Sequence, residues 1–193
     1  MPDRGQAPTH WHQVLGTLVE LVNSSPPASE VDDLATVDGV RRFIDRRIIT
    51  EVARPAASDV SALRLVREQL RAIVHEQDEV MRIRLVNTAL ASATIHPRLA
   101  DHDGLGLHLH FFPRDARVAD HLLADCAMAV AELMVAGEGS RLKQCAVPGC
   151  GRAFVDLTRN RSRAYCDSRR CGNRIHAAAY RERLRTAASE AAT

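Results

Sequence analysis

The sequence predicts a mainly α-helical protein with a small β-hairpin in its N-terminal part, followed by a compact C-terminal unit built around cysteines. Apolar residues recur at helical spacing through most of the first 136 residues. One segment, residues 105–112, instead alternates with the period of two that is typical of a strand. Four of the five cysteines lie between residues 145 and 171. We therefore expect two domains: a helical body over residues 1–138 and a cysteine module over residues 139–193.

Five segments of the helical body are predicted to be helices. They cover, in order, residues 10–23, the second half of 28–54, 58–74, 80–96 and 116–136. Residues that commonly start or end helices flank these segments: Pro26, Pro27, Ser58, Asp59, Pro97, Asp115 and Gly137. We expect Ser58 or Asp59 to cap the third helix and Asp115 to cap the fifth.

Each predicted helix has one apolar face that should be buried. On the second helix this face comprises Val40, Phe43, Ile44 and Ile48. On the fourth helix it comprises Val80, Ile83, Val86, Asn87 and Leu90. On the fifth it comprises Leu122, Cys126, Val130 and Leu133. Cys126, the odd cysteine, is therefore expected to be a small core residue rather than a reactive thiol.

The alternating segment predicts a strand with one buried face. Leu107 and Leu109 alternate with His108 and His110, and we expect this strand to form a hairpin with residues 97–100. The two histidines then share a face. With His96 or His102 they would form a ligand or metal site; the simpler interpretation is a polar outer face.

The four clustered cysteines form two pairs, Cys145 with Cys150 and Cys166 with Cys171. Four residues separate the members of each pair and fifteen separate the pairs, which suits a structural Zn²⁺ bound by four thiolates. Two disulfides or four unpaired thiols are the alternatives. Disulfides need an oxidising compartment, whereas residues 1–13 contain no apolar signal core and no run of about eighteen apolar residues occurs. We therefore expect a cytoplasmic protein with one structural Zn²⁺ and no membrane span.

The cysteine module is expected to contain a knuckle, a hairpin and a helix tied by one metal, a treble-clef-like plan. Pro148-Gly149 supplies a tight turn inside the first cysteine pair. Residues 153–155 and 164–165 are predicted to pair as the hairpin, with residues 158–162 at its tip. Asp167 or Ser168 could cap the final helix, so that Cys171 lies in its first turn.

The two parts of the chain also differ in the sign of their net charge. Residues 141–185 hold twelve Lys or Arg and three acids, a net charge of +9, whereas residues 1–140 carry −6. This asymmetry favours a polyanion partner, here double-stranded DNA, over a merely solvated basic surface. The expected contacts are Lys143, Arg159, Arg161, Arg163, Arg169, Arg170, Asn173, Arg174, Arg181 and Arg185. Asn173 could pair with adenine or make a structural bond instead.

The tetrapeptide Cys171-Gly172-Asn173-Arg174, with CAVPGC before it and HAAAYRER after it, resembles the CGNR zinc-finger family over about residues 145–185. The helical body is similar to the ABATE domain, whose members are described as stress-induced transcription regulators. The similar pieces are LVELVNS (18–24), DDLAT (32–36), residues 58–74 and the Gly-Leu-His-Leu strand. Glu20 and Ser24 stand where that family commonly has Asp and Thr. The resemblance implies a mostly helical N-terminal domain with a small sheet, and a zinc finger that binds DNA.

A basic, metal-bound module on a larger acidic domain favours a transcription regulator whose helical body senses an effector, forms a homodimer, or both. Asn23, His108 and His110 are the candidates for a small-molecule effector pocket. The alternative is a zinc-stapled module that binds RNA or another protein without reading DNA sequence. No nucleophile elbow, phosphate loop or HExxH pattern occurs, and four thiolates leave zinc no open position, so enzyme activity is not expected.

Overall fold

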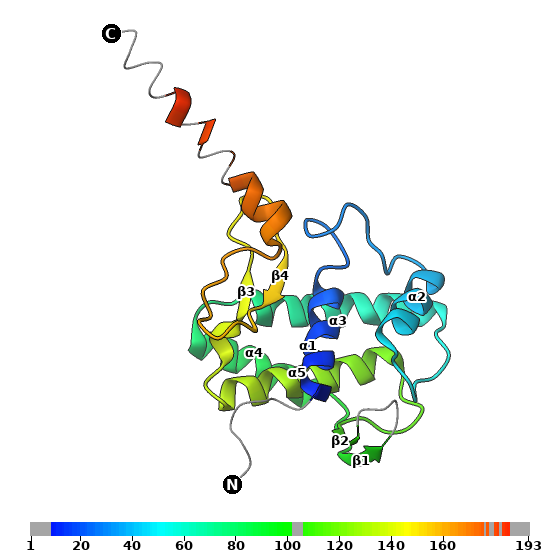
Figure 1. The fold of residues 1–193 in the computed structure, drawn as a ribbon. Coiled ribbons are helices and arrows are strands. Elements are labelled where there is room, and N and C mark those ends of the chain that lie inside the picture. Colours follow the sequence, from blue (N-terminus) through cyan, green and yellow to red (C-terminus); the bar gives the residue numbers. More distant parts are fainter. Residues whose placement is uncertain (1–8, 102–105, 176, 178–179, 182, 186–193) are drawn as a thin grey trace.

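The structure, a computed structural model, describes residues 9–101, 106–175, 177, 180–181 and 183–185 (Figure 1). The helices are α1 (Thr9–Val22), α2 (Val37–Arg47), α3 (Ala57–His75), α4 (Glu79–Ser92) and α5 (Val118–Val135). The strands are β1 (Arg98–Asp101), β2 (Leu107–His110), β3 (Leu142–Gln144) and β4 (Ala153–Val155), which form two antiparallel pairs. The mainly helical fold is thus confirmed. Within the described residues, no helix is long and apolar enough to cross a membrane.

Helix α5 lies at the centre of the helical body and packs against α1, α3 and α4. Its residues between 118 and 130 are buried on nearly all sides, as expected of a helix with neighbours around it. Cys126 is fully buried among them, and this burial raises the pKa of its thiol far above the usual range. The prediction that Cys126 is a core residue is therefore confirmed.

Helix α4 presents a different face to the core from the one predicted. Arg82, Val86 and Ala89 are buried, whereas Val80 and Ile83 are 60% and 45% exposed. The helix lies at the edge of the body, against α3 and α5, and so buries only a narrow stripe. Two backbone carbonyls that accept hydrogen bonds from Arg82 hold that side chain inward.

Three helix ends also differ from the prediction. Ile48 is exposed and ends α2 in a left-handed conformation with φ 52°, instead of joining its buried face. Asp59 is not the N-cap of α3 but lies in its first turn, where its carboxylate accepts a hydrogen bond from the N–H of Ala56. Helix α5 begins at Val118 and is not capped by Asp115, whose φ is 58°.

The hairpin β1–β2 forms as predicted, with residues 98–101 opposite residues 110–107. Its buried face is the opposite of the expected one, because His108 and His110 are buried while Leu107 and Leu109 are exposed. The alternation identified a strand, but the histidine face turns toward α5. A polar outer face made by the histidines was therefore the wrong interpretation.

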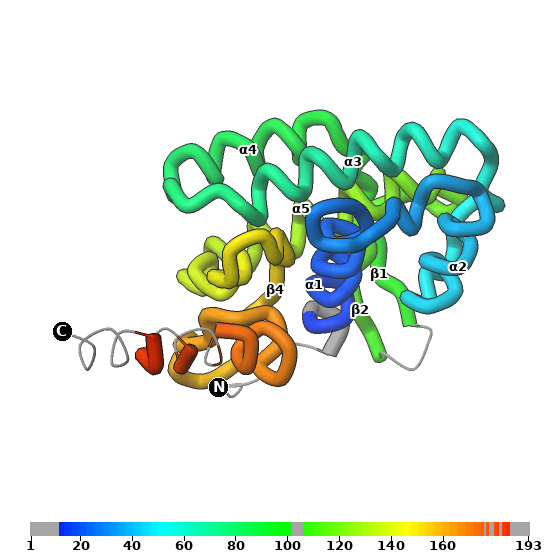
Figure 2. The backbone as a smooth tube through the Cα atoms, turned by 90° about the horizontal axis from the view of Figure 1, so that it is seen from above, coloured from blue at the N-terminus to red at the C-terminus, as the bar shows by residue number. Residues whose placement is uncertain are grey.

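The cysteine module is fixed directly to the helical body rather than joined by an open linker. Residues 139–141 form a short 3-10 turn that leads into β3. Leu142 of β3 and Ala153 of β4 belong to the same hydrophobic core as α1, α3 and α5. The side chain of Asn23, just after α1, bonds to both backbone groups of Ala153: its Oδ1 accepts from the N–H at 2.8 Å and its Nδ2 donates to the carbonyl at 2.9 Å. In Figures 1 and 2 the module lies on one side of α1 and the hairpin β1–β2 on the other.

Replacement of Asn23 should loosen this attachment. The substitution Asn23→Ala leaves the buried N–H and carbonyl of Ala153 without these partners, which should lower the free energy of unfolding by about 2 kcal/mol. Urea denaturation measures the change. Asn160→Ala, on an exposed loop of the module, is the control and should change it by less than about 0.5 kcal/mol. Equal stability of the two variants would contradict the structural role of Asn23.

Candidate metal centre

The four clustered cysteines bring their sulfur atoms together in the cysteine module. All four Sγ atoms lie within 4.8 Å of one another, and the three separations among Cys150, Cys166 and Cys171 are 3.6–3.7 Å. A tetrahedral Zn²⁺ with Zn–S bonds of about 2.3 Å places its sulfurs about 3.8 Å apart. A disulfide would need about 2.05 Å, and the cysteines are free thiols. The four residues therefore fit one structural Zn²⁺, as predicted.

The first cysteine pair lies on a tight knuckle. The N–H of Cys150 donates to the carbonyl of Val147 at 3.0 Å, which closes the turn. Gly149 has a φ of 73°, a conformation that side chains disfavour. The predicted turn at Pro148-Gly149 is thus confirmed.

The predicted hairpin of residues 153–155 with 164–165 does not form. Strand β4 pairs with β3 instead, so that residues 142–144 lie opposite 155–153. The arginines of segment 158–163 therefore lie on an irregular loop rather than at a hairpin tip. This loop is held against the knuckle by a hydrogen bond from the N–H of Ala146 to the carbonyl of Ala164, at 2.9 Å.

A buried carboxylate, Asp156, organises the same loop. It accepts hydrogen bonds of 2.6–3.0 Å from the hydroxyl and N–H of Thr158, the Nζ of Lys143 and the N–H of Arg163. Burial alone would raise the pKa of Asp156, but these donors outweigh it and hold the pKa far below its usual range. Sequence reasoning missed this residue, because a single acid in a basic segment gives no local signal of burial.

The second cysteine pair is positioned by the start of the final helix. Asp167 caps the π-helical turn Ser168–Gly172, and its carboxylate accepts from the N–H groups of Arg169 and Arg170 at 2.8 and 3.0 Å. These backbone bonds lower the pKa of Asp167. Cys171 lies in this turn, as predicted, and the described residues from 173 to 185 continue as helix.

Electrostatics favour a cation among the sulfurs. Burial, together with neighbouring sulfur atoms, raises the pKa of Cys166 and of Cys171, whereas burial of Cys145 is outweighed by backbone and thiol hydrogen bonds that lower its pKa. One thiolate is thus stabilised by its neighbours, but thiolates held this close repel one another, so Cys166 and Cys171 favour the protonated form without a metal. A divalent cation at the centre reverses this preference, because a coordinated thiol loses its proton.

Nine of the ten residues predicted to contact DNA fall into two groups. Four have side chains bonded within the protein: Lys143, Arg161, Arg163 and Arg174. Five are exposed, and no hydrogen bond or ion pair of their side chains is found within the described part of the chain: Arg159, Arg169, Arg170, Asn173 and Arg181. Arg185 is exposed on the same helix. The structural bond considered for Asn173 is thus absent from the described residues.

The three candidate effector residues do not line one pocket. The amide of Asn23 bonds to Ala153 in the cysteine module. His108 and His110 lie in β2, which is on the opposite side of α1 from that module (Figure 2). The prediction of a shared pocket was wrong because the sequence does not show that Asn23 is already used as a structural link.

The two strand histidines instead join a buried group on α5. The Nε2 atoms of His108 and His110 are 3.1 Å apart, and the carboxylate of Asp125 lies 3.7 Å from both His110 and His121. Burial lowers the pKa of His121 to about 4, so this ring is neutral near pH 7. Sequence reasoning missed the two α5 residues because they interrupt an apolar helix face without forming a motif.

The histidine-based metal site weighed from the sequence is not found among the described residues. There, the four cysteines are the one group of three or more His, Cys, Asp or Glu side chains with metal-ligand geometry. His96 is exposed, and His102 lies outside the described residues.

The fold and the site together define a zinc-finger protein with a helical body. Two family models match the chain: the CGNR zinc finger over residues 141–184, and ABATE, described as "Putative stress-induced transcription regulator", over residues 16–137. The second match spans more than half of the 193 residues, and the chain therefore belongs to the ABATE family, with a CGNR zinc finger after its ABATE domain. The comparison with curated proteins found no match.

Loss of one thiolate should release the metal. Cys166→Ser is expected to reduce bound zinc from one equivalent to near zero and to unfold the loop and turn around the site, because metal binding and folding are coupled in small modules. The helical body should keep its far-UV circular dichroism. Zinc content by atomic absorption tests this, with Cys126→Ser, a cysteine outside the site, as the variant that retains zinc. Full zinc content in Cys166→Ser would refute the four-cysteine site.

Proposed function

We propose that this protein is a cytoplasmic, DNA-binding transcription regulator whose cysteine module contacts duplex DNA through arginines. The observation that carries the proposal is the set of exposed arginines on the metal-bound turn and the helix after it. Arg169 and Arg170 directly precede the ligand Cys171, and Arg181 follows on the helix. Guanidinium groups without intramolecular acid partners are suited to phosphate oxygens and to guanine edges.

The acids of the cysteine module leave its surface strongly positive. Asp156 is fully buried and ion-paired with Lys143, and Asp167 is used as a helix cap. Neither carboxylate forms a salt bridge with Arg169, Arg170 or Arg181 in the described part of the chain, although the backbone N–H groups of Arg170 and Arg169, and then their charges, lower the pKa of Asp167. At the described surface of the module the exposed arginines outnumber the exposed acids, which favours a polyanion.

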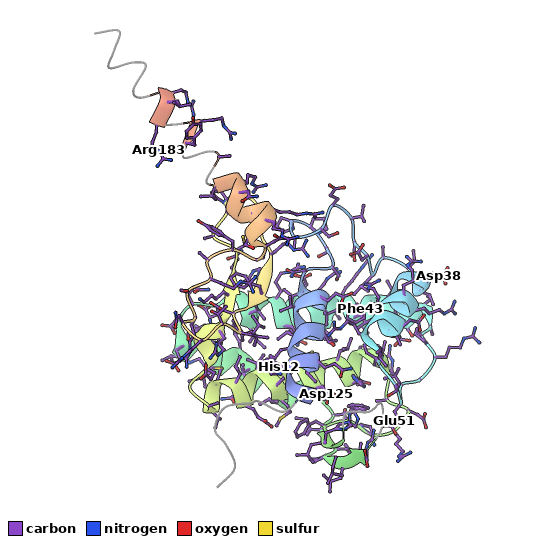
Figure 3. The ribbon with its side chains drawn as sticks, in the orientation of Figure 1. His12, Asp38, Phe43, Glu51, Asp125 and Arg183 are labelled. Atoms are coloured by element: carbon purple, nitrogen blue, oxygen red, sulfur yellow. The ribbon has the colours of Figure 1, made fainter. Side chains whose placement is uncertain are left out.

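The final helix is well placed to reach DNA. Its described residues project from the zinc site away from the helical body (Figure 1), and Arg183 lies far out on it (Figure 3). A helix that stands clear of its own body can enter a major groove without a clash from the rest of the chain. Because so small a module covers few base pairs, we propose that the helical body, residues 1–138, pairs two copies on two half-sites or senses an effector.

Selection of bound fragments from a random duplex library, with zinc-loaded protein at about 0.15 M salt, tests the proposal. We expect enrichment of a shared motif, and an inverted repeat would support a dimer. Binding without a motif would reduce the function to non-specific nucleic-acid binding. Failure to bind DNA, with binding to RNA or to an acidic protein, would favour the alternative of a zinc-stapled interaction module.

Substitution of the exposed arginines should weaken DNA binding without loss of zinc. For Arg170→Ala and for Arg181→Ala, each lost phosphate contact should lower the slope of log K against log salt concentration by about 0.9. Fluorescence anisotropy over a salt series measures both affinity and slope. Arg84→Ala, an exposed arginine on α4, is the matched control and should bind as the unmodified protein does. Unchanged slopes in both module variants would place the interface elsewhere.

A further inference from the structure

A cleft of about 690 Å³ lies between the helical body and the cysteine module. Its walls come from the α3–α4 connection, the region around the end of α5, strand β3 and the loop that precedes Cys166. Polar side chains from both parts line it: Gln77, Arg82, Ser140, Lys143, Gln144 and Arg163. A cleft of this size with a few polar groups has the dimensions of a small-molecule site.

Arg82 is the unusual residue of this cleft. Its side chain is only 6% exposed, and its terminal nitrogens donate to the carbonyls of Glu76 and Gly139. Its Nε is buried without a hydrogen-bond partner, and no salt bridge to Arg82 occurs within the described residues. Because a buried charge is costly unless it is paired, a guanidinium satisfied only by carbonyls lacks its counter-charge.

Another buried arginine in the same body shows the contrast. Arg67, which is 4% exposed, forms two hydrogen bonds to the carboxylate of Asp32, at 2.7 and 3.0 Å. The counter-charge of Arg67 thus comes from the chain itself, so Arg67 needs no ligand to neutralise it. Arg82 has a similar degree of burial but lies against a cleft instead of a carboxylate.

The other charges around the cleft do not supply the missing anion. Glu79 is the one acid among its described lining residues, and it forms no salt bridge with Arg82, although the two are three residues apart on α4. Lys143 is neutralised by Asp156, and Arg163 adds a further positive charge. The lining therefore carries an excess of positive charge.

We infer that this cleft binds a small organic anion, whose carboxylate or phosphate oxygens are the counter-charge of Arg82. Two of the five N–H donors of Arg82 are used by carbonyls. Ser140 and Gln144 offer further polar groups from the side of the module. A ligand there touches both the helical body and the strand that leads to Cys145, so it contacts both parts of the chain at once. The inference names an effector class for the proposed regulator, but the binding itself does not require that the module binds DNA.

Calorimetric titration of the zinc-loaded full chain with succinate, citrate, salicylate, inorganic phosphate and glycerol 3-phosphate tests the inference, with succinamide and glycerol as neutral controls. We expect saturable binding of at least one organic anion and none of the neutral compounds. Equal binding of inorganic phosphate would show that the anionic group alone is recognised. Absence of saturable binding by every anion would overturn the inference.

Variants locate the site. Arg82→Met should weaken the binding at least tenfold. Arg84 lies two residues further along the same helix and is exposed, so Arg84→Met should leave the binding unchanged. Because Arg82→Met removes two structural hydrogen bonds, an exposed cleft residue gives a second test. Ser140→Glu places a negative charge in the lining and should also weaken anion binding about tenfold, whereas Ser140→Gln should not. Binding that survives both Arg82→Met and Ser140→Glu would overturn the inference, whatever the DNA experiments show.

Discussion

The rest of the structure depends on one constraint: the strand pair β3–β4 of the cysteine module is partly buried in the core of the helical body. Leu142 and Ala153 lie in the same apolar core as α1, α3 and α5, and Asn23 bonds to both backbone groups of Ala153. Strand pair β3–β4 therefore cannot turn relative to the helices without exposure of core surface. This packing therefore sets the orientation of the zinc site, of the turn that follows it and of the start of the final helix.

Within the cysteine module, polar and metal interactions replace an apolar core. Its own buried cluster is small: Cys145, Val147 and Cys171, with Cys150, Tyr165, Cys166 and Ile175 against it. So few apolar residues cannot stabilise about 45 residues alone, which is why such modules need a metal or another staple. The zinc ligands fix the knuckle and the turn, while Asp156 fixes the loop between them. Asp156 is buried in a pair with Lys143, while the arginines of the turn, Arg169 and Arg170, remain exposed.

The sequence predicted what depends on local chemistry and failed where the outcome depends on packing. Cysteine spacing and the Asp167 cap involve residues close in the chain, and both were identified correctly. The predicted partner of residues 153–155 was wrong because both 142–144 and 164–165 are short segments, and contact with the helical body favours 142–144. The alternation of residue types with a period of two likewise identified β2, but it did not show that the histidine face of the strand is the buried one. Buried Arg82 gave no signal at all, since its carbonyl partners come from the segment before α4 and from residue 139.

Two sets of hydrogen bonds hold the cysteine module against the helical body, and Arg82 makes one of them. On one side Asn23 ties β4 to α1. On the other, Arg82 of α4 bonds to the carbonyl of Gly139, in the short turn that leads directly into β3 and then to Cys145. The guanidinium that we infer to bind an anion is therefore also a structural contact of that turn. Arg82 thus lies between the cleft and the segment that leads to the zinc site, whereas Asn23, which holds the module through β4, is not among the residues that line the cleft.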